Sequence, residues 1–190
     1  TPIKSSAASD VYKRQGDKYM KIIVGAGKTK YDGWISTQED ELNLLNMEQW
    51  ENLKGDKEIE AILAEHVWEH LSLEEGKEAA KNCFRFLKEG GYVRCAVPDK
   101  NFKNALYQST IKIGGPGEEN HPAANHKIVY DYKTLVKVFE EAGFEVFLLE
   151  YCDEHGDFHY KPWDESKGKI YRSYRFDNRN SSNKLGMVSI

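Results

Sequence analysis

The sequence has no long hydrophobic run and no feature of a secretion signal. No apolar stretch approaches the roughly 18 residues of a membrane-spanning helix, and the N-terminus lacks the apolar core of a signal peptide. Cysteine is scarce, and Cys83, Cys95 and Cys152 lack the spacing of a metal or redox motif. These absences predict a cytoplasmic protein with reduced thiols and no membrane partner.

Neither sign of charge is in large excess. The 190 residues include 27 Lys and Arg and 31 Asp and Glu, which gives a formal net charge of −4. This balance gives no electrostatic reason to expect nucleic acid or an anionic membrane as the main partner.

The two ends of the chain differ from its middle. Residues 1–17 are polar, rich in small residues and without periodicity, so we expect a disordered or non-native leader. Residues 18–190 are then expected to form a single domain with one core. A strand-like run begins at Leu185 and stops at Ile190, so the last strand is expected to be truncated.

The middle of the chain, Ile59–Asp99, indicates a strand, a helix and a second strand. Residues 59–64 are apolar, as in a strand that is covered on both faces. Residues 92–97 predict the second strand. Ligands bind at strand ends in open α/β sheets, so polar residues after the first strand mark the expected site.

The intervening helix carries its own start and stop signals. Ser72, followed three residues later by Glu75, has the spacing of a capping box. Gly90–Gly91 predict the helix stop.

The same alternation continues along the chain and predicts an α/β fold with a doubly wound sheet. Only nine residues separate the first two strands, fewer than a parallel crossover needs, so the first helix is expected to be missing or shortened to one turn. Further strands are expected at residues 20–24, 34–37, 41–45 and 144–151, and helices at 47–53 and 132–142.

Gly25, Ala26 and Gly27 follow the first strand, where glycine lets the backbone approach a ligand closely. Lys30 occupies the place of the third glycine of a dinucleotide loop, which favours a nucleoside cofactor without a pyrophosphate. The alternative is an ordinary tight turn. A nucleoside also requires an acidic residue after the second strand, where the chain has Gln38 and then Glu39.

Residues 66–70 read HVWEH, which matches the inverted zinc-peptidase motif H-x-x-E-H. Both histidines are expected on a loop or the first helical turn rather than on one helix face. We therefore favour Glu65 and His66 as cavity residues and His70 as a packed loop residue, and we predict no metal ligands. His126 is a second histidine that could act as a general base.

Taken together, these motifs resemble the class I S-adenosylmethionine-dependent methyltransferases, and more narrowly the small bacterial predicted methyltransferases related to the type 11 group. The resemblance covers residues 20–190 and rests on IIVGAGKTKYDGWIST, ILAEHVWEHLSLEEG, NCFRFLKEGGYVRCAVPD, NHKIVYDYKTL, WDESKGKIYRS and RFDNRN.

The resemblance implies a Rossmann-like fold, S-adenosylmethionine as cofactor and methyl transfer to an acceptor, for which we expect a small molecule. It places Gly25, Ala26 and Gly27 along the cofactor, with Glu65 and His66 beside it. Gln38 stands where related chains carry an acidic residue, so ribose binding is expected to be weaker or to shift to Glu39.

Two other functions remain open at this point. One is a catalytically silent cofactor-binding or scaffold protein of the same fold, which the departure at Gln38 motivates. The other is a zinc hydrolase that uses His66 and His70. If the methyl acceptor must lose a proton, His66 and His126 are the candidate bases.

Overall fold

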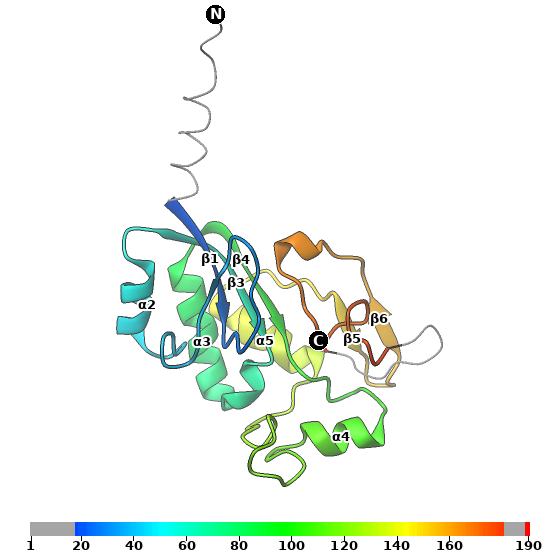
Figure 1. Cartoon of the computed structure of the whole chain (residues 1–190). Helices are drawn as coiled ribbons and strands as arrows, with labels where there is room; N and C mark the ends of the chain where they lie inside the picture. Colours follow the sequence, from blue (N-terminus) through cyan, green and yellow to red (C-terminus); the bar gives the residue numbers. More distant parts are fainter. Residues whose placement is uncertain (1–17, 181–188) are drawn as a thin grey trace, which may run out of the picture.

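Four parallel strands form the centre of the protein. The structure is a computed structural model that describes residues 18–180 and 189–190. The sheet order is β2-β1-β3-β4 (Figure 1). All three neighbouring pairs are parallel, which confirms the predicted α/β class with a parallel sheet. The strands are β1 (Tyr19–Val24), β2 (Ile35–Ser36), β3 (Glu58–Glu65) and β4 (Leu87–Ala96).

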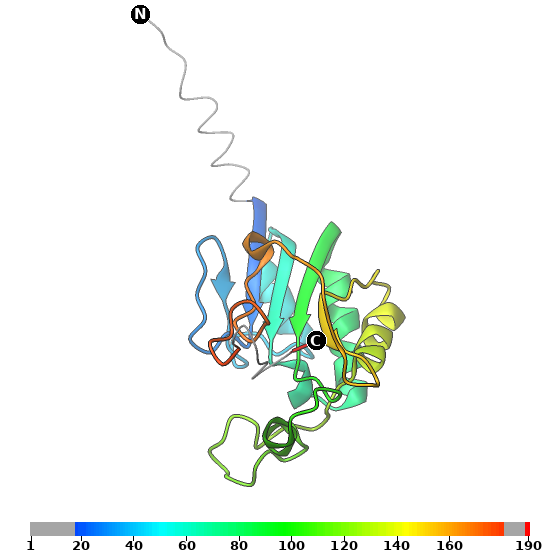
Figure 2. The same ribbon diagram turned by 90° about the vertical axis from the view of Figure 1, so that its right-hand side faces the viewer.

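Helices cover one face of this sheet. Ile22 and Ile62 of the sheet belong to the same buried cluster as Trp50, Cys83 and Phe139 of three helices. A further short helix lies beyond the carboxyl ends of the strands (Figures 1 and 2). The helices are α2 (Met47–Lys54), α3 (Leu73–Phe86), α4 (Ala105–Ile111) and α5 (Tyr132–Ala142), with 3-10 turns η1 (Trp68–His70) and η2 (Glu165–Lys167).

The other face is covered by coil. Ile23 and Leu63 pack there with Ile170, Trp34 and Trp163. Figure 2 shows α3 behind the sheet and the orange segment that contains η2 in front of it. Within the described residues, α-helices therefore cover only one face, whereas the doubly wound prediction expected them on both. The physical reason is the short β1–β2 link, which contains turns and no helix, as predicted.

The start of α3 is as predicted, but its end is not. Ser72 and Glu75 form the capping box. The helix already ends at Phe86, and the backbone becomes extended at Leu87, the first residue of β4. Gly90, with φ of 71°, lies inside β4 at a shift in the pairing with β3, so Gly90–Gly91 bend a strand rather than stop the helix.

Two predicted strands are wrong in whole or in part. Residues 41–45 form turns and coil, because side chains take up the backbone groups that a strand would pair: the Leu45 N–H donates to Asn43 Oδ1 and the Asn43 N–H to Gln49 Oε1. Of residues 144–151, only the end is strand: β5 (Glu150–Cys152) pairs with β6 (Phe158–Tyr160) in a separate antiparallel ribbon. Helix α5 has the predicted bounds and ends at Gly143 in the left-handed region.

The predictions for the two termini lie mostly outside the described residues. The leader, residues 1–17, and the start of the last strand at Leu185 cannot be compared with the structure. Ser189 and Ile190 are described and lie antiparallel to the chain just after β4, where the Ile190 N–H donates to Val97 O at 2.9 Å.

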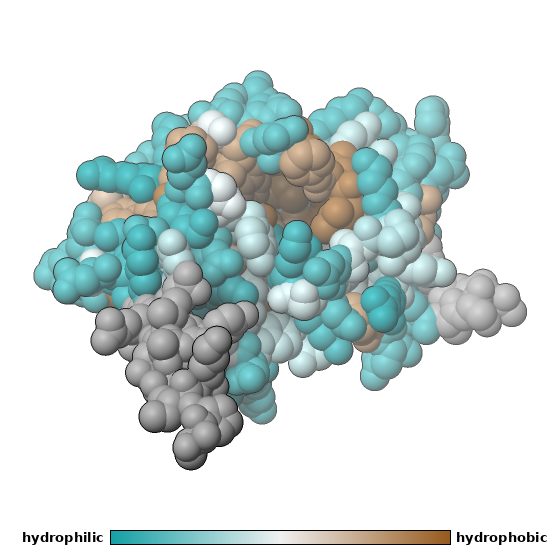
Figure 3. Space-filling model, turned by 90° about the horizontal axis from the view of Figure 1, so that it is seen from above, coloured by the Kyte–Doolittle hydropathy of each residue, from teal (hydrophilic) through white to brown (hydrophobic). Residues whose placement is uncertain are grey.

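An apolar hollow opens on the face seen from above (Figure 3). A cavity of about 820 Å³ lies between β4 and the segment that follows α5, with Phe139 and Phe144 in its wall.

Among the described residues, no helix is both long and apolar enough to cross a membrane. Cys83, Cys95 and Cys152 are free thiols, as predicted.

Candidate functional site

A cavity of about 540 Å³ lies at the carboxyl ends of β1 and β3. The strand order reverses here, because β2 lies on one side of β1 whereas β3 and β4 lie on the other. Crevices at such reversal points are the usual ligand sites of open parallel sheets. The residues of its wall that were predicted from the sequence are Gly25, Ala26, Glu65, His66 and His126.

The loop after β1 requires glycine at its first position. Gly25 has φ of 56°, and a Cβ there would lie 2.9 Å from Val67 Cγ2. The Ala26 N–H donates to Thr37 O at 2.9 Å, which ties the loop to the end of β2. The backbone of Gly25 and Ala26 thus forms a bare, fixed edge of the cavity.

Gln38 holds this loop rather than lining the cavity. The Gly27 N–H donates to Gln38 Oε1 at 3.2 Å, and Gln38 Nε2 donates to Gly27 O at 2.9 Å. The amide thus satisfies both backbone groups of Gly27, which a carboxylate, having no donor, could not do.

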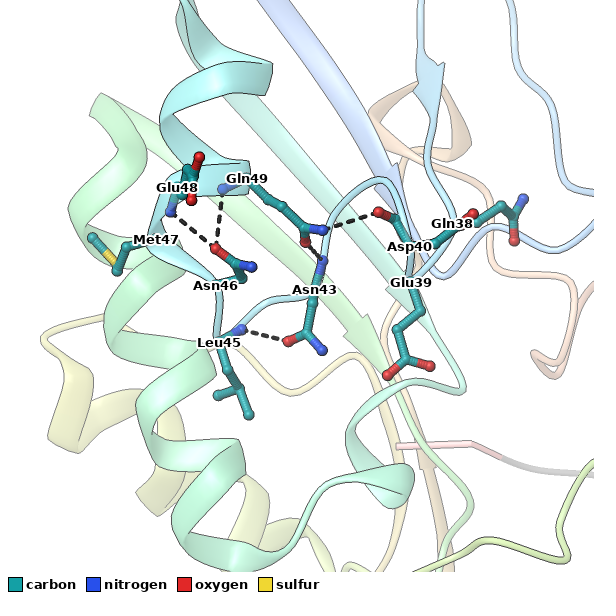
Figure 4. A pocket seen from close by; sticks show the side chains of 9 residues that line it. All are labelled: Gln38, Glu39, Asp40, Asn43, Leu45, Asn46, Met47, Glu48 and Gln49. Carbon is teal, nitrogen blue, oxygen red and sulfur yellow. Dashed lines mark hydrogen bonds between the residues drawn. The ribbon is translucent and has the colours of Figure 1, made fainter.

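Glu39 also lies outside this cavity. With Gln38 it borders a separate open depression at the start of α2 (Figure 4). The polar side chains there hold the chain itself: Asn46 accepts from two N–H groups of α2, and Gln49 Nε2 donates to Asp40 O. Nothing among these contacts points to a ligand.

Glu65 anchors the coil that covers the cavity. Its two carboxylate oxygens accept from the N–H groups of Tyr171, at 3.1 Å, and Arg172, at 2.6 Å. The side chain therefore lines the cavity and also fixes its cover.

His66 is the only described non-glycine residue with positive φ, at 58°. Such a backbone is uncommon and often occurs at functional sites. The conformation turns the imidazole from the end of β3 toward Glu69, and His66 Nδ1 lies 2.8 Å from Glu69 Oε1. The two atoms are within ion-pair distance but are not aligned as a hydrogen bond.

Glu69 is a buried carboxylate that the sequence analysis did not select. Its exposed fraction is 1%, and within the described part of the chain neither oxygen accepts a hydrogen bond. Its backbone oxygen accepts from the Lys127 N–H at 2.8 Å, which joins η1 to the segment that carries His126. The motif HVWEH contained this residue, but no pattern in the sequence indicates its burial.

His70 and His126 lie beside this carboxylate. Their ring centroids are 4.9 Å apart, edge to face, and His70 Nδ1 is buried with no hydrogen-bond partner among the described residues. His126 Nδ1 lies 2.9 Å from Ile111 O, and burial lowers the pKa of the ring. His70 thus belongs to a polar cluster at the cavity wall, whereas the sequence favoured a packed loop residue away from the cavity.

Among the described residues, the three that lie close enough together to hold a metal ion are Glu69, His70 and His126. His66 is not among them, although the inverted zinc-peptidase motif uses both of its histidines as ligands. The hydrolase pairing of His66 with His70 is therefore not the arrangement that the structure brings together.

Arginines from the late coil complete the wall. Arg172 and Arg179 line the cavity together with Tyr171. Arg179 pairs with Asp177, whose pKa is lowered by its bonds to that guanidinium despite the opposing effect of burial. Neither arginine was selected from the sequence, which carries no signal that places the late coil beside the strand ends.

No protein-family model matches the sequence, and no curated protein is significantly similar to it.

Proposed function

We propose that this protein binds S-adenosylmethionine in the cavity at the ends of β1 and β3 and transfers its methyl group to a small-molecule acceptor. The observation that carries the proposal is the position of that cavity, where the strand order reverses and a glycine loop meets Glu65 and His66. In this account the fold is Rossmann-like, of the class I methyltransferase type.

The cavity has the size and lining that this cofactor requires. Its volume of about 540 Å³ falls within the roughly 300–1,000 Å³ of small-molecule sites. Leu63, Pro98 and Ile111 offer apolar surface for an adenine ring, and Glu65 and Arg172 offer charges for the polar ends. The bare backbone of Gly25 allows close approach.

The main role of the protein's residues is to hold the cofactor and the acceptor in the right relative position. The sulfonium of S-adenosylmethionine supplies an already activated methyl group, so alignment with the acceptor accounts for most of the expected acceleration. Gln38 acts here as a positioning residue, because it fixes Gly27. Glu39 lies outside the cavity, so the ribose contacts shift to groups inside it. Glu65, the last residue of β3, is the candidate for these contacts.

A proton acceptor is needed only for acceptors that lose a proton. His66 is the better placed of the two predicted histidines, because its side chain is about a quarter exposed in the cavity and Glu69 faces its Nδ1. His126 is nearly fully buried, and its Nδ1 is occupied by Ile111 O.

Calorimetry of the chain with S-adenosylmethionine and S-adenosylhomocysteine tests the proposal, with NAD as the comparison ligand. We expect binding of both sulfur compounds, no binding of NAD, and loss of binding in Gly25→Val with retention in the matched variant Gly33→Ala, whose site is remote and open. Absence of binding to the wild-type chain would exclude the proposed function. Binding without methyl transfer over a broad acceptor panel would instead favour the scaffold alternative.

A further inference from the structure

We propose that Glu69, His70 and His126 bind a divalent first-row transition-metal ion, with zinc as the first candidate. One donor atom from each residue lies within 4.8 Å of the other two. Two imidazole nitrogens and one carboxylate oxygen are a ligand set found in catalytic zinc sites and in other first-row metal sites. The inference does not depend on methyl transfer.

The carboxylate of Glu69 is the strongest observation. It is 1% exposed, and neither of its oxygens accepts a hydrogen bond within residues 18–180 and 189–190. Buried carboxylates normally have hydrogen bonds or a cation, because removal from water otherwise disfavours the charge. His66 Nδ1 approaches only Oε1, so a bound cation would supply a partner for Oε2, which has none among the described residues.

His126 is prepared to act as a ligand. A carbonyl oxygen only accepts, so the 2.9 Å contact with Ile111 O requires a proton on Nδ1. The neutral ring then presents the lone pair of Nε2, which lies 4.0 Å from Glu69 Oε1. Histidines that bind metal ions usually donate from their other ring nitrogen to a carboxylate, a backbone carbonyl or water, which fixes the orientation of the ring.

His70 supplies the third donor. Its Nδ1 is buried without a hydrogen-bond partner in the described part of the chain, and its ring meets that of His126 edge to face. The backbone bond from Lys127 N to Glu69 O keeps the two segments together without any ion. The donors are therefore held close by the fold itself.

The distances indicate a site that tightens on binding. Ligands about 2.1 Å from a tetrahedral ion are about 3.5 Å apart, so the donor atoms would move together by about an ångström. All three residues border the cavity of about 540 Å³, so the fourth position of the ion would face it. An oxygen-bearing ligand, such as water or an acceptor hydroxyl, fits that position.

Metal analysis of the 190-residue chain tests this directly. The protein is stripped with a chelator, incubated with zinc and desalted, and its zinc is measured by mass spectrometry. We expect about one equivalent in the wild type and a loss of at least about tenfold in Glu69→Gln, His70→Ala and His126→Ala. His155→Ala is the matched control, because His155 is exposed on a remote turn, and it should retain the metal.

Folding is monitored in parallel by circular dichroism, and zinc should raise the melting temperature of the wild type but not of Glu69→Gln. If a histidine variant fails to fold, the nearly isosteric Glu69→Gln variant decides the question. The proposal is overturned if the wild type takes up no zinc, or if Glu69→Gln, folded, retains it fully. Equal loss in His155→Ala would overturn it as well, since uptake would then not depend on this cluster.

Discussion

At the scale of single residues, the site depends on backbone conformations that few side chains allow. Gly25 directly follows β1 and His66 directly follows β3, and both have positive φ, at 56° and 58°. Glycine adopts this region without strain, whereas a histidine there costs about 1–2 kcal/mol. The strain at His66 is maintained by its surroundings and directs the imidazole toward Glu69.

Gly25→Ala should destabilise the protein more than Gly27→Ala. Both glycines have φ near 55°, so both variants carry left-handed strain of about 1–2 kcal/mol. Only at position 25 would the new Cβ also meet Val67, at 2.9 Å, whereas nothing lies within 4 Å at position 27. Urea unfolding should therefore show a further loss of about 1 kcal/mol for Gly25→Ala. Equal losses would show that the contact with Val67 is unimportant.

The sequence predicted the cavity residues better than it predicted the contacts between them. Gly25, Glu65 and His66 were selected because strand ends point to one edge of a parallel sheet. Glu69 was missed because nothing in HVWEH tells a buried carboxylate from a solvated one. Gln38 was selected for its place after the second strand, but it lies outside the cavity and holds Gly27, a contact that depends on two loops that only the fold brings together.

At the scale of elements, α3 shows which features of a helix can be predicted from the sequence and which depend on tertiary packing. Its capping box was predictable because both residues lie within one turn. Its end was not, because a direct passage from Leu87 into β4 requires no glycine. Gly76, by contrast, lies in the first turn of the helix for a tertiary reason: a Cβ there would lie 2.8 Å from Tyr130 Oη.

Gly76→Ala should destabilise the protein although alanine favours helix. The propensity gain is about 1 kcal/mol, but Trp68 and Tyr130 are fully buried around this position, and overpacking costs about 1–3 kcal/mol. We expect a net loss of about 1 kcal/mol in urea unfolding. Because Tyr130 Oη has no hydrogen-bond partner within the described chain, Tyr130→Phe in the same background should recover part of the loss. Stabilisation by Gly76→Ala would contradict this packing.

The start of α3 also predicts a pH dependence. Lys127 Nζ donates to Glu75 at 2.8 Å, and this bond, helped by the Ser72 N–H, lowers the pKa of Glu75 from 4.5 to about 2. A lowered native pKa means that the stabilisation is complete above about pH 4.5 and is lost as the pH falls through about 2. In Lys127→Ala, carboxyl NMR titration should show the pKa of Glu75 moving up toward 4.5. Lys133→Ala is the control: it removes an ion pair with Glu154, which does not involve Glu75, and it should leave the pKa of Glu75 unchanged.

At the scale of the whole molecule, the late coil is the second layer of the protein. Arg94 Nη1 donates to Asp164 O at 2.8 Å and to Gly168 O at 2.6 Å, and its guanidinium lies over Trp163. Together with the contacts of Glu65 to Tyr171 and Arg172, these contacts bind the coil to the sheet. The parallel sheet was predictable from apolar runs and loop lengths, but the contacts that hold this coil to the sheet were not, because the coil has no periodicity.

Removal of these donors should loosen the cover. In Arg94→Met the apolar stem stays, but both hydrogen bonds to the coil are lost. We expect amide hydrogen exchange of residues 164–170 to become at least about tenfold faster, while α3 remains protected. Arg85→Met, an exposed arginine of α3, serves as the control. Unchanged exchange at residues 164–170 would mean that other contacts hold the coil.

The most direct test of the central claim is a crystal structure of the chain with S-adenosylhomocysteine. The account predicts density for the ligand at the carboxyl ends of β1 and β3, along Gly25 and Ala26 and beside Glu65. Density elsewhere, for example in the apolar cavity beside β4, or a cavity that stays free of ligand at saturating concentration, would contradict it.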